Sequence, residues 1–220
     1  MRTLTVISSG LSTPSTTRRV ADSIAAAVTA AVSARGESLE VEVIELRELV
    51  NDLGRSLTTG MSSPALDEVK AKVSASDGLV VVTPVFKASY SGLFKTFFDV
   101  LDQDALNGMP VIIAATAGTA RHSLVLDYAL RPLMTYMRAF VVPTGVFAAT
   151  DDFGSEDGAG LESRVNRAAG ELADQMVASA SVGGLGGVTA EGQGVRRRTG
   201  VEPGEGFVDF AALLKGHDGQ

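Results

Sequence analysis

The chain has 220 residues, of which 45% are hydrophobic and 20% charged. This composition excludes a wholly disordered chain, a collagen and a basic tail protein. At roughly 150 residues per domain, the length favours one domain with an appendage over two full domains. The net charge of −7 and the sequence pI near 4.9 disfavour a nucleic acid as partner, because a phosphodiester backbone binds basic surfaces.

Residue content excludes several further classes of site. The chain has no cysteine, so it has no disulfide, no thiolate metal site and no cysteine nucleophile. Its two histidines, His122 and His217, lie far apart and belong to no metal-binding motif. No apolar run reaches the roughly 18 residues of a membrane span, and the first residues become polar too early for a signal peptide. We therefore expect a cytoplasmic protein without membrane contact.

Short β-branched runs alternate with longer helical patterns over the first 150 residues. Strands are expected at 3–8, 39–46, 78–84, 110–116 and 139–147, and helices at about 15–35, 64–74, 91–101, 122–138 and 160–180. The run at 39–46 alternates apolar and acidic residues, as an edge strand does, whereas 78–84 is continuously apolar and indicates a central strand. These five βα units predict a flavodoxin-like α/β/α sandwich with a five-stranded parallel sheet in the order 2-1-3-4-5.

The helix expected at 122–138 contains a proline in its interior. Pro132 has no backbone N–H and crowds the carbonyl near Tyr128. We therefore expect this helix to be kinked or widened there.

The amino-acid composition of the chain changes near residue 180. Residues 181–206 contain nine glycines, which is the composition of a linker, whereas FVDFAALLK at 207–215 is apolar. We expect one domain over 1–180, a linker over 181–206, and a C-terminal segment over 207–220 that docks on this subunit or a neighbour. The arginines at 196–198 are interpreted as a solvated charge run, with contact to an acidic partner or a nucleotide phosphate as the alternative.

The loop at 8–19 follows the first strand and opens onto a helix N-terminus. It is rich in hydroxyl side chains, and free backbone N–H groups at such a helix end attract anions. The loop lacks the glycine pattern of a dinucleotide site and the lysine of a nucleoside triphosphate site. A single phosphomonoester, such as that of FMN, fits it better. The alternative is ordinary helix capping by Ser15 or a neighbour.

The loop at 83–95 follows the central strand and reaches the same edge of the predicted sheet. Pro84 ends the strand, Phe86 can lie against a planar ring, and Gly92 permits a close backbone approach. Alternatively, Phe86 is a core residue and Lys87 a solvated surface charge.

The loop at 116–122 is the third to converge on that edge. Gly118 and Thr119 present backbone N–H groups before the next helix, although a simple turn and cap explains them equally well. Ligands in open α/β sheets bind outside the carboxyl ends of the strands, where the strand order reverses. The three loops therefore predict one binding crevice.

Three motifs in these loops resemble the NADPH-dependent FMN reductase family, whose flavodoxin-like members supply reduced flavin to two-component monooxygenases. The resemblance is carried by PSTT at 14–17, TPVFKASYSGLFK at 83–95 and TAGTARHSLVLDYALRP at 116–132, and it covers about residues 3–150. Two positions depart from the family pattern. Phe86 stands where tyrosine is common, and Thr119 where a second glycine often occurs.

The resemblance implies an activity and a set of site residues. The chain would be an NAD(P)H-dependent FMN reductase that transfers hydride from the nicotinamide to flavin N5, using FMN and NADPH, with NADH possible. Because the cofactor performs the chemistry, no residue is assigned a catalytic role. The residues expected to bind the cofactor are Ser9, Ser12, Ser15, Thr16, Thr17, Pro84, Val85, Phe86, Ser89, Thr116, Gly118 and Thr119. Arg18, Arg121 and Lys87 are the candidate cations for the 2′-phosphate of NADPH.

The resemblance also implies partners. Reduced FMN is expected to leave as a product for a flavin-dependent monooxygenase, since residues 8–17 contain no lysine or arginine to hold the phosphate dianion. A homodimer or homotetramer is expected, with Met134, Tyr136 and Met137 either at the interface or in the core. The alternatives are a quinone, azo-dye or metal-ion reductase with permanently bound FMN, and a non-catalytic flavodoxin-like electron carrier.

Overall fold

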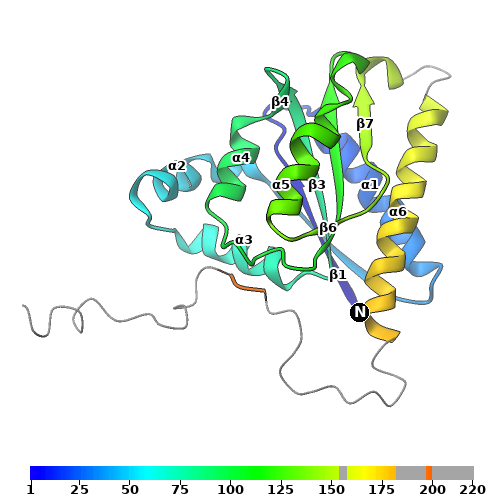
Figure 1. The fold of residues 1–220 in the computed structure, drawn as a ribbon, viewed down its shortest axis with the longest axis horizontal. Helices are drawn as coiled ribbons and strands as arrows, with labels where there is room; N and C mark the ends of the chain where they lie inside the picture. Colours follow the sequence, from blue (N-terminus) through cyan, green and yellow to red (C-terminus); the bar gives the residue numbers. More distant parts are fainter. Residues whose placement is uncertain (154–157, 182–196, 200–220) are drawn as a thin grey trace, which may run out of the picture.

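The computed structural model describes residues 1–153, 158–181 and 197–199 (Figure 1). The strands are β1 (Arg2–Ser8), β2 (Leu39–Glu45), β3 (Gly78–Phe86), β4 (Ser89–Tyr90), β5 (Pro110–Ala117), β6 (Phe140–Val141) and β7 (Val146–Ala149). The helices are α1 (Thr16–Ser33), α2 (Val50–Thr59), α3 (Pro64–Ala75), α4 (Gly92–Asp99), α5 (Arg131–Tyr136) and α6 (Gly158–Ser181). Short helical turns are η1 (Leu46–Leu49), η2 (Ala120–His122), η3 (Leu126–Leu130) and η4 (Thr150–Asp152).

The sheet has the predicted flavodoxin-like order. Its path is β2-β1-β3-β5-β6 with parallel pairing throughout, which is 2-1-3-4-5 when the main strands are counted along the chain. β7 also pairs with β5, and the short β4 pairs antiparallel with the end of β3. Helices α1 and α6 pack on one face, and α2 to α5 pack on the other (Figure 1). The three-layer α/β/α fold predicted from the sequence is confirmed.

The central strand explains why two separate cores form. Along β3, Leu79 and Val81 belong to the core beneath α2 to α5, whereas Val80 and Val82 belong to the core beneath α1 and α6. Successive side chains of a strand point to opposite faces, so a continuously apolar strand supplies both cores at once. β2 is the edge strand, as its alternation of apolar and acidic residues predicts.

The strand expected at 139–147 is split into β6 and β7. Pro143 lies in the gap and cannot donate a backbone hydrogen bond to a neighbouring strand. At the next residue, the carboxylate of Glu171 on α6 replaces a strand as hydrogen-bond acceptor. It accepts from the Thr144 N–H at 2.8 Å and from the Thr144 hydroxyl at 2.7 Å. Both short strands still pair with β5, so the sheet order is unaffected.

The helix expected at 122–138 is also broken. The chain forms the 3₁₀ turn η2, then the π-helical turn η3, and only then α5. The wide turn directly precedes Pro132, which stands at the start of α5. A π turn accommodates a residue that lacks a backbone donor, so the predicted widening is confirmed.

Some elements were not expected from the sequence. The segment after β2 forms η1 and then α2, an amphipathic helix that ends at Gly60 with φ of 72°. Gly54 inside this helix weakens the sequence signal, because glycine lowers helix propensity. The strand β4 is only two residues long, and its pairing with β3 depends on the turn between them.

The tail is described only at residues 197–199, within the linker expected over 181–206. Arg197 is half-buried: its Nε donates to the carbonyl of Asn107 at 3.1 Å, and its Nη1 donates to the carbonyl of Ser76. Burial lowers the pKa of this guanidinium. The expectation of a solvated charge run is therefore wrong for Arg197, because its guanidinium donates hydrogen bonds to backbone carbonyls at the amino edge of the sheet. The docking segment expected at 207–220 lies outside the described residues.

Within the described residues, no helix is both long enough and apolar enough to cross a membrane.

The contact between Glu171 and Thr144 leads to a prediction about stability. Glu171→Ala leaves a partly buried backbone N–H without its acceptor, so the free energy of unfolding should fall by about 1–3 kcal/mol in a denaturant titration. Arg167→Ala, at an exposed position of the same helix, is the control and should change it by less than about 0.5 kcal/mol. Equal effects of the two variants would show that Glu171 does not brace the broken strand.

Candidate functional site

A cavity of about 320 Å³ opens at the carboxyl ends of β1, β3 and β5. Eight of the residues expected to bind a cofactor line it: Ser12, Thr16, Thr17, Pro84, Val85, Phe86, Thr116 and Gly118. Leu11, Ala117 and Thr150 complete the lining and were not expected. A larger cavity of about 460 Å³ lies between α1 and α6, but none of the predicted site residues lines it. The first cavity is therefore the candidate site.

The N-terminus of α1 supplies hydrogen-bond donors to this cavity. The Ser15 hydroxyl caps the helix by accepting from the Arg18 N–H at 3.1 Å. Thr16 and Thr17 lie between Ser15 and Arg18, and their N–H groups have no acceptor among the described residues. Free N–H groups at the positive end of a helix dipole form an anion-binding site. The cavity thus has an anion-binding end.

Buried hydroxyl groups tie the three loops to one another. The hydroxyls of Thr17 and Thr116 share a hydrogen bond of 2.9 Å between the first and third loops. Ser91 Oγ donates to Ser9 Oγ at 3.2 Å, and the Ser91 N–H donates to Thr83 Oγ1 at 3.0 Å. These contacts hold the first and second loops together beneath the cavity. Thr83 and Ser91 were missed in the sequence, although both belong to the motif at 83–95.

Four of the expected residues do not line the cavity. Ser9 is fully buried below it, and its hydroxyl donates to the carbonyl of Val82 at 3.3 Å. Ser15 is buried as the helix cap, Ser89 belongs to β4, and Thr119 is exposed at the start of η2. The structure therefore gives Ser15 the capping role left open by the sequence, and gives Ser9 a bracing role.

The second loop is a tight hairpin. Lys87 and Ala88, the two residues between β3 and β4, have φ of 50° and 67°. Positive φ at both turn residues is the geometry that matches the twist of paired strands, although most such turns use glycine or asparagine. The hairpin leaves the Phe86 side chain 45% exposed at the cavity, which rules out a core role. A Cβ at Gly92 would meet no protein atom within 4 Å, so the packing of the chain itself does not require glycine there.

The first loop fits a compact anionic group. A Cβ at Gly10 would lie 2.1 Å from Ser15 Oγ, so the loop can fold back on the helix cap only with glycine here. At the base of the loop, the buried Ser8 hydroxyl has no hydrogen-bond partner among the described residues. The free N–H groups of α1, together with Ser12 and Thr16 in the cavity lining, match a phosphate monoester, which accepts hydrogen bonds from several directions. The site therefore fits the phosphate of FMN.

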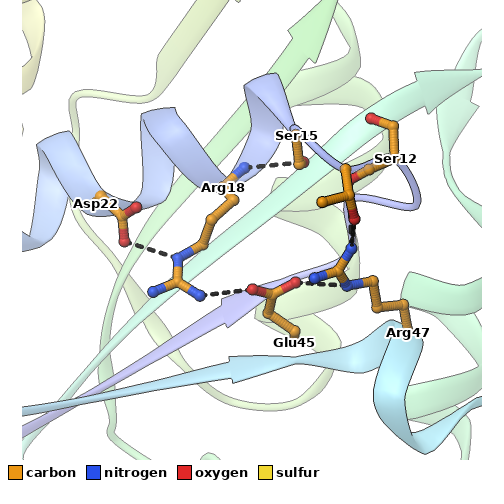
Figure 2. A network of polar contacts seen from close by, with 7 residues as sticks. Ser12, Ser15, Arg18, Asp22, Glu45 and Arg47 are labelled. Atoms are coloured by element: carbon orange, nitrogen blue, oxygen red, sulfur yellow. Dashed lines mark hydrogen bonds and ion pairs between the residues drawn. The ribbon is translucent and has the colours of Figure 1, made fainter.

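A network of charged side chains borders the first loop (Figure 2). Glu45, at the end of β2, pairs with Arg18 at 2.6 Å and with Arg47 at 2.7 Å. Arg18 also pairs with Asp22 at 2.7 Å. These hydrogen bonds, first to Asp22 and then to Glu45, raise the pKa of Arg18 further above its ordinary value. Arg18, a candidate for a nucleotide phosphate, is thus already paired.

Arg47 also contacts the loop itself. Its Nη1 donates to the carbonyl of Ser12 at 3.4 Å and to the hydroxyl of Thr13 (Figure 2). Arg47 and Glu45 were missed in the sequence, because they lie about 30 residues after the loop and reach it only through the pairing of β1 with β2. Lys87 and Arg121 are exposed and form no ion pair within the described residues.

Comparison with known proteins identifies the family. The sequence model described as NADPH-dependent FMN reductase matches residues 2–154. The chain belongs to the NADPH-dependent FMN reductase family. The resemblance inferred from three motifs is confirmed, and with it the assignment as an NAD(P)H:FMN oxidoreductase that uses FMN and a nicotinamide nucleotide.

Relatives of this FMN reductase are found in bacteria. An FMN reductase (NADPH) of Pseudomonas aeruginosa is 41% identical over 126 residues, which is 56% of this chain and 68% of that protein. An NADH-dependent FMN reductase, SfnE, of Pseudomonas putida is 40% identical over 143 residues, or 65% and 74% of the two chains. Among solved structures, an oxidoreductase from Corynebacterium diphtheriae is 69% identical with a TM-score of 0.79, covering 81% of this chain and 98% of that one. The apo form of the NADH:FMN oxidoreductase EmoB is 31% identical with a TM-score of 0.66, covering 77% and 89%.

The close contact at Gly10 leads to a prediction for this FMN reductase. Gly10→Ala forces the first loop away from Ser15, so the dissociation constant of FMN should rise about ten-fold or more in a fluorescence titration. Gly92→Ala is the matched control, because its new methyl group meets open space, and it should leave that constant unchanged. Unaltered FMN affinity in Gly10→Ala would mean that the folded-back loop does not form the phosphate site.

Proposed function

We propose that this FMN reductase binds FMN as an exchangeable substrate in the cavity between the three loops, reduces it, and releases reduced FMN to a flavin-dependent monooxygenase. The observation that carries this proposal is the first loop, where residues 8–17 offer hydroxyls and helix N–H groups but no lysine or arginine. Neutral donors orient a phosphate without the attraction of an unpaired cation. Such a site favours exchange over permanent retention.

The phosphate is placed at the N-terminus of α1 in this proposal. Ser12, Thr16 and Thr17 line the cavity there, and the N–H groups of Thr16 and Thr17 have no acceptor among the described residues. Ser9 and Ser15 support the loop from below and at the helix cap. The family resemblance implies that all five residues bind the cofactor; we now divide them into three that contact the phosphate and two that shape its site.

The flavin ring is placed over the second and third loops. Pro84, Val85 and Phe86 line the cavity on one side, and Gly118 lies at its exposed end. The bound nucleotides supply the chemistry, a hydride passing from the nicotinamide to flavin N5. The chain's own task is to stack the two rings and to point backbone N–H groups near Gly118 at the flavin's pyrimidine end, where negative charge grows. Ser89, in β4, and Thr119, exposed before η2, do not line the cavity.

The decisive test of this function is a steady-state comparison of electron acceptors with the full chain freed of flavin. NADPH and NADH oxidation should depend on added FMN and saturate with it, and reduced FMN should be transferable to an added flavin-dependent monooxygenase. Turnover with quinones by a chain that retains FMN through dialysis would instead favour the quinone or azo reductase alternative. Absence of nicotinamide oxidation despite flavin binding would favour an electron carrier.

Two exposed cations near the cavity lead to a prediction about nucleotide preference. Lys87 stands at the tip of the hairpin and Arg121 in η2, and neither forms an ion pair within the described residues. If one of them binds the 2′-phosphate, its replacement by alanine should raise KM for NADPH about ten-fold and leave KM for NADH unchanged. Initial rates with both nucleotides separate these effects. Equal changes for the two nucleotides in both variants would place the 2′-phosphate elsewhere.

We further propose that the chain forms a homodimer or homotetramer through the stretch from η2 to β6. Four large apolar side chains are exposed there: Leu124, Tyr128, Tyr136 and Phe140. Met134 and Met137, considered earlier as interface residues, are buried in the core. Exposed apolar side chains concentrated in one stretch of a chain favour an interface between copies.

This interface proposal is tested by light scattering after size exclusion. Tyr128→Glu, at a side chain that is 78% exposed, should lower the molar mass toward that of one chain, because a charge would be buried between subunits. Leu57→Glu on α2, an exposed apolar position elsewhere, is the matched control and should leave the mass unchanged. An oligomer that is unaffected by Tyr128→Glu would place the interface on another face.

A further inference from the structure

The charges around the first loop are balanced. Arg18 borders it from the first turn of α1, and Arg47 borders it from η1. Two carboxylates, Glu45 and Asp22, pair with these arginines, so the four side chains together carry no net charge. A site evolved only to hold a dianion tightly would leave at least one cation free to reach it.

Glu45 is the side chain that pairs with both arginines. Its Oε1 accepts from Arg18 Nη1 at 2.6 Å, and its Oε2 forms an ion pair with Arg47 Nε at 2.7 Å (Figure 2). Each carboxylate oxygen thus serves one arginine. The Glu45 side chain is only 14% exposed, so water and salt screen its charge far less than that of Asp22, which is 51% exposed.

We propose that Glu45 sets the flavin affinity of this enzyme by neutralising the two arginines that border the phosphate loop, which keeps FMN exchangeable. The inference rests on the proposed function, in which the FMN phosphate lies at the N-terminus of α1. Glu45 holds the arginines away from the phosphate and adds a negative charge that repels it. The loop then binds the phosphate through N–H and hydroxyl donors alone.

A purely structural role for Glu45 makes the opposite prediction. Arg47 holds the loop through Ser12 and Thr13, and Glu45 anchors Arg47. If bracing were its whole role, Glu45→Gln would loosen the loop and weaken FMN binding. If the charge balance dominates, the same substitution frees positive charge and strengthens FMN binding. The sign of the change therefore separates the two roles.

The experiment measures dissociation constants of FMN and riboflavin for the full chain by quenching of flavin fluorescence. Riboflavin lacks the phosphate, so it reports the ring site alone. Glu45→Gln should tighten FMN binding about ten-fold, because a negative charge beside a dianion is removed. Riboflavin binding should change by less than about two-fold. The FMN affinity of this variant should also fall more steeply with added NaCl.

A second variant keeps the proposal testable if the first folds poorly. Arg47→Gln retains a donor for the loop but leaves one oxygen of Glu45 unpaired, so it should weaken FMN binding about ten-fold and leave riboflavin unaffected. The double variant Glu45→Gln with Arg47→Gln restores the balance, so its FMN affinity should return to within about two-fold of the unmodified enzyme. Thermal unfolding of each variant shows whether the fold persists.

The control for net charge is Asp174→Asn, which removes a carboxylate paired with Arg35 beyond the far end of α1. It should leave both constants unchanged. Weaker FMN binding by Glu45→Gln, or equal changes for FMN and riboflavin, would overturn the role of Glu45 and leave the proposed function standing. A chain that binds neither flavin would instead overturn the proposed function.

Discussion

The parallel alignment of β1, β3 and β5 is the constraint on which the rest of this molecule depends. Because the three strands run the same way, their carboxyl ends meet at one edge, and the loops that follow them have to share the space above it. Hydroxyl pairs then lock these loops in register, Thr17 with Thr116 and Ser9 with Ser91. The cavity is thus a product of strand direction and a few buried hydrogen bonds.

The cavity offers free hydrogen-bond donors, but the arginines that border the first loop are already paired. The N-terminus of α1 offers free N–H groups, whereas the nearby arginines are occupied by Glu45 and Asp22. An anion can therefore be oriented without being strongly retained, which is consistent with the proposal that FMN exchanges as a substrate. Catalysis also needs little from the side chains, since the nucleotides carry the reactive atoms and the chain orients them.

Much of the fold could be predicted because strand and helix signals are local. The continuously apolar run at 78–84 became the central strand, and the alternating run at 39–46 became the edge. Pro132 indicated an irregular turn, which the structure forms as the π turn η3. One error, the continuous strand expected at 139–147, occurs where a distant residue takes part. The break at Pro143 is stabilised by Glu171 on α6, and no local pattern points to that partner.

The candidate site also divides into features that local sequence predicts and features that depend on distant residues. By itself, the sequence determined the fold class, the family and three converging loops, because strand order, helix ends and motif residues are encoded in short contiguous segments. Only the tertiary structure decided which hydroxyls face the cavity, which brace it from below, and that Glu45 and Arg47 border the first loop. The physical reason is that burial, hydrogen-bond partners and charge balance depend on residues brought together by strand pairing, across separations that no local pattern records.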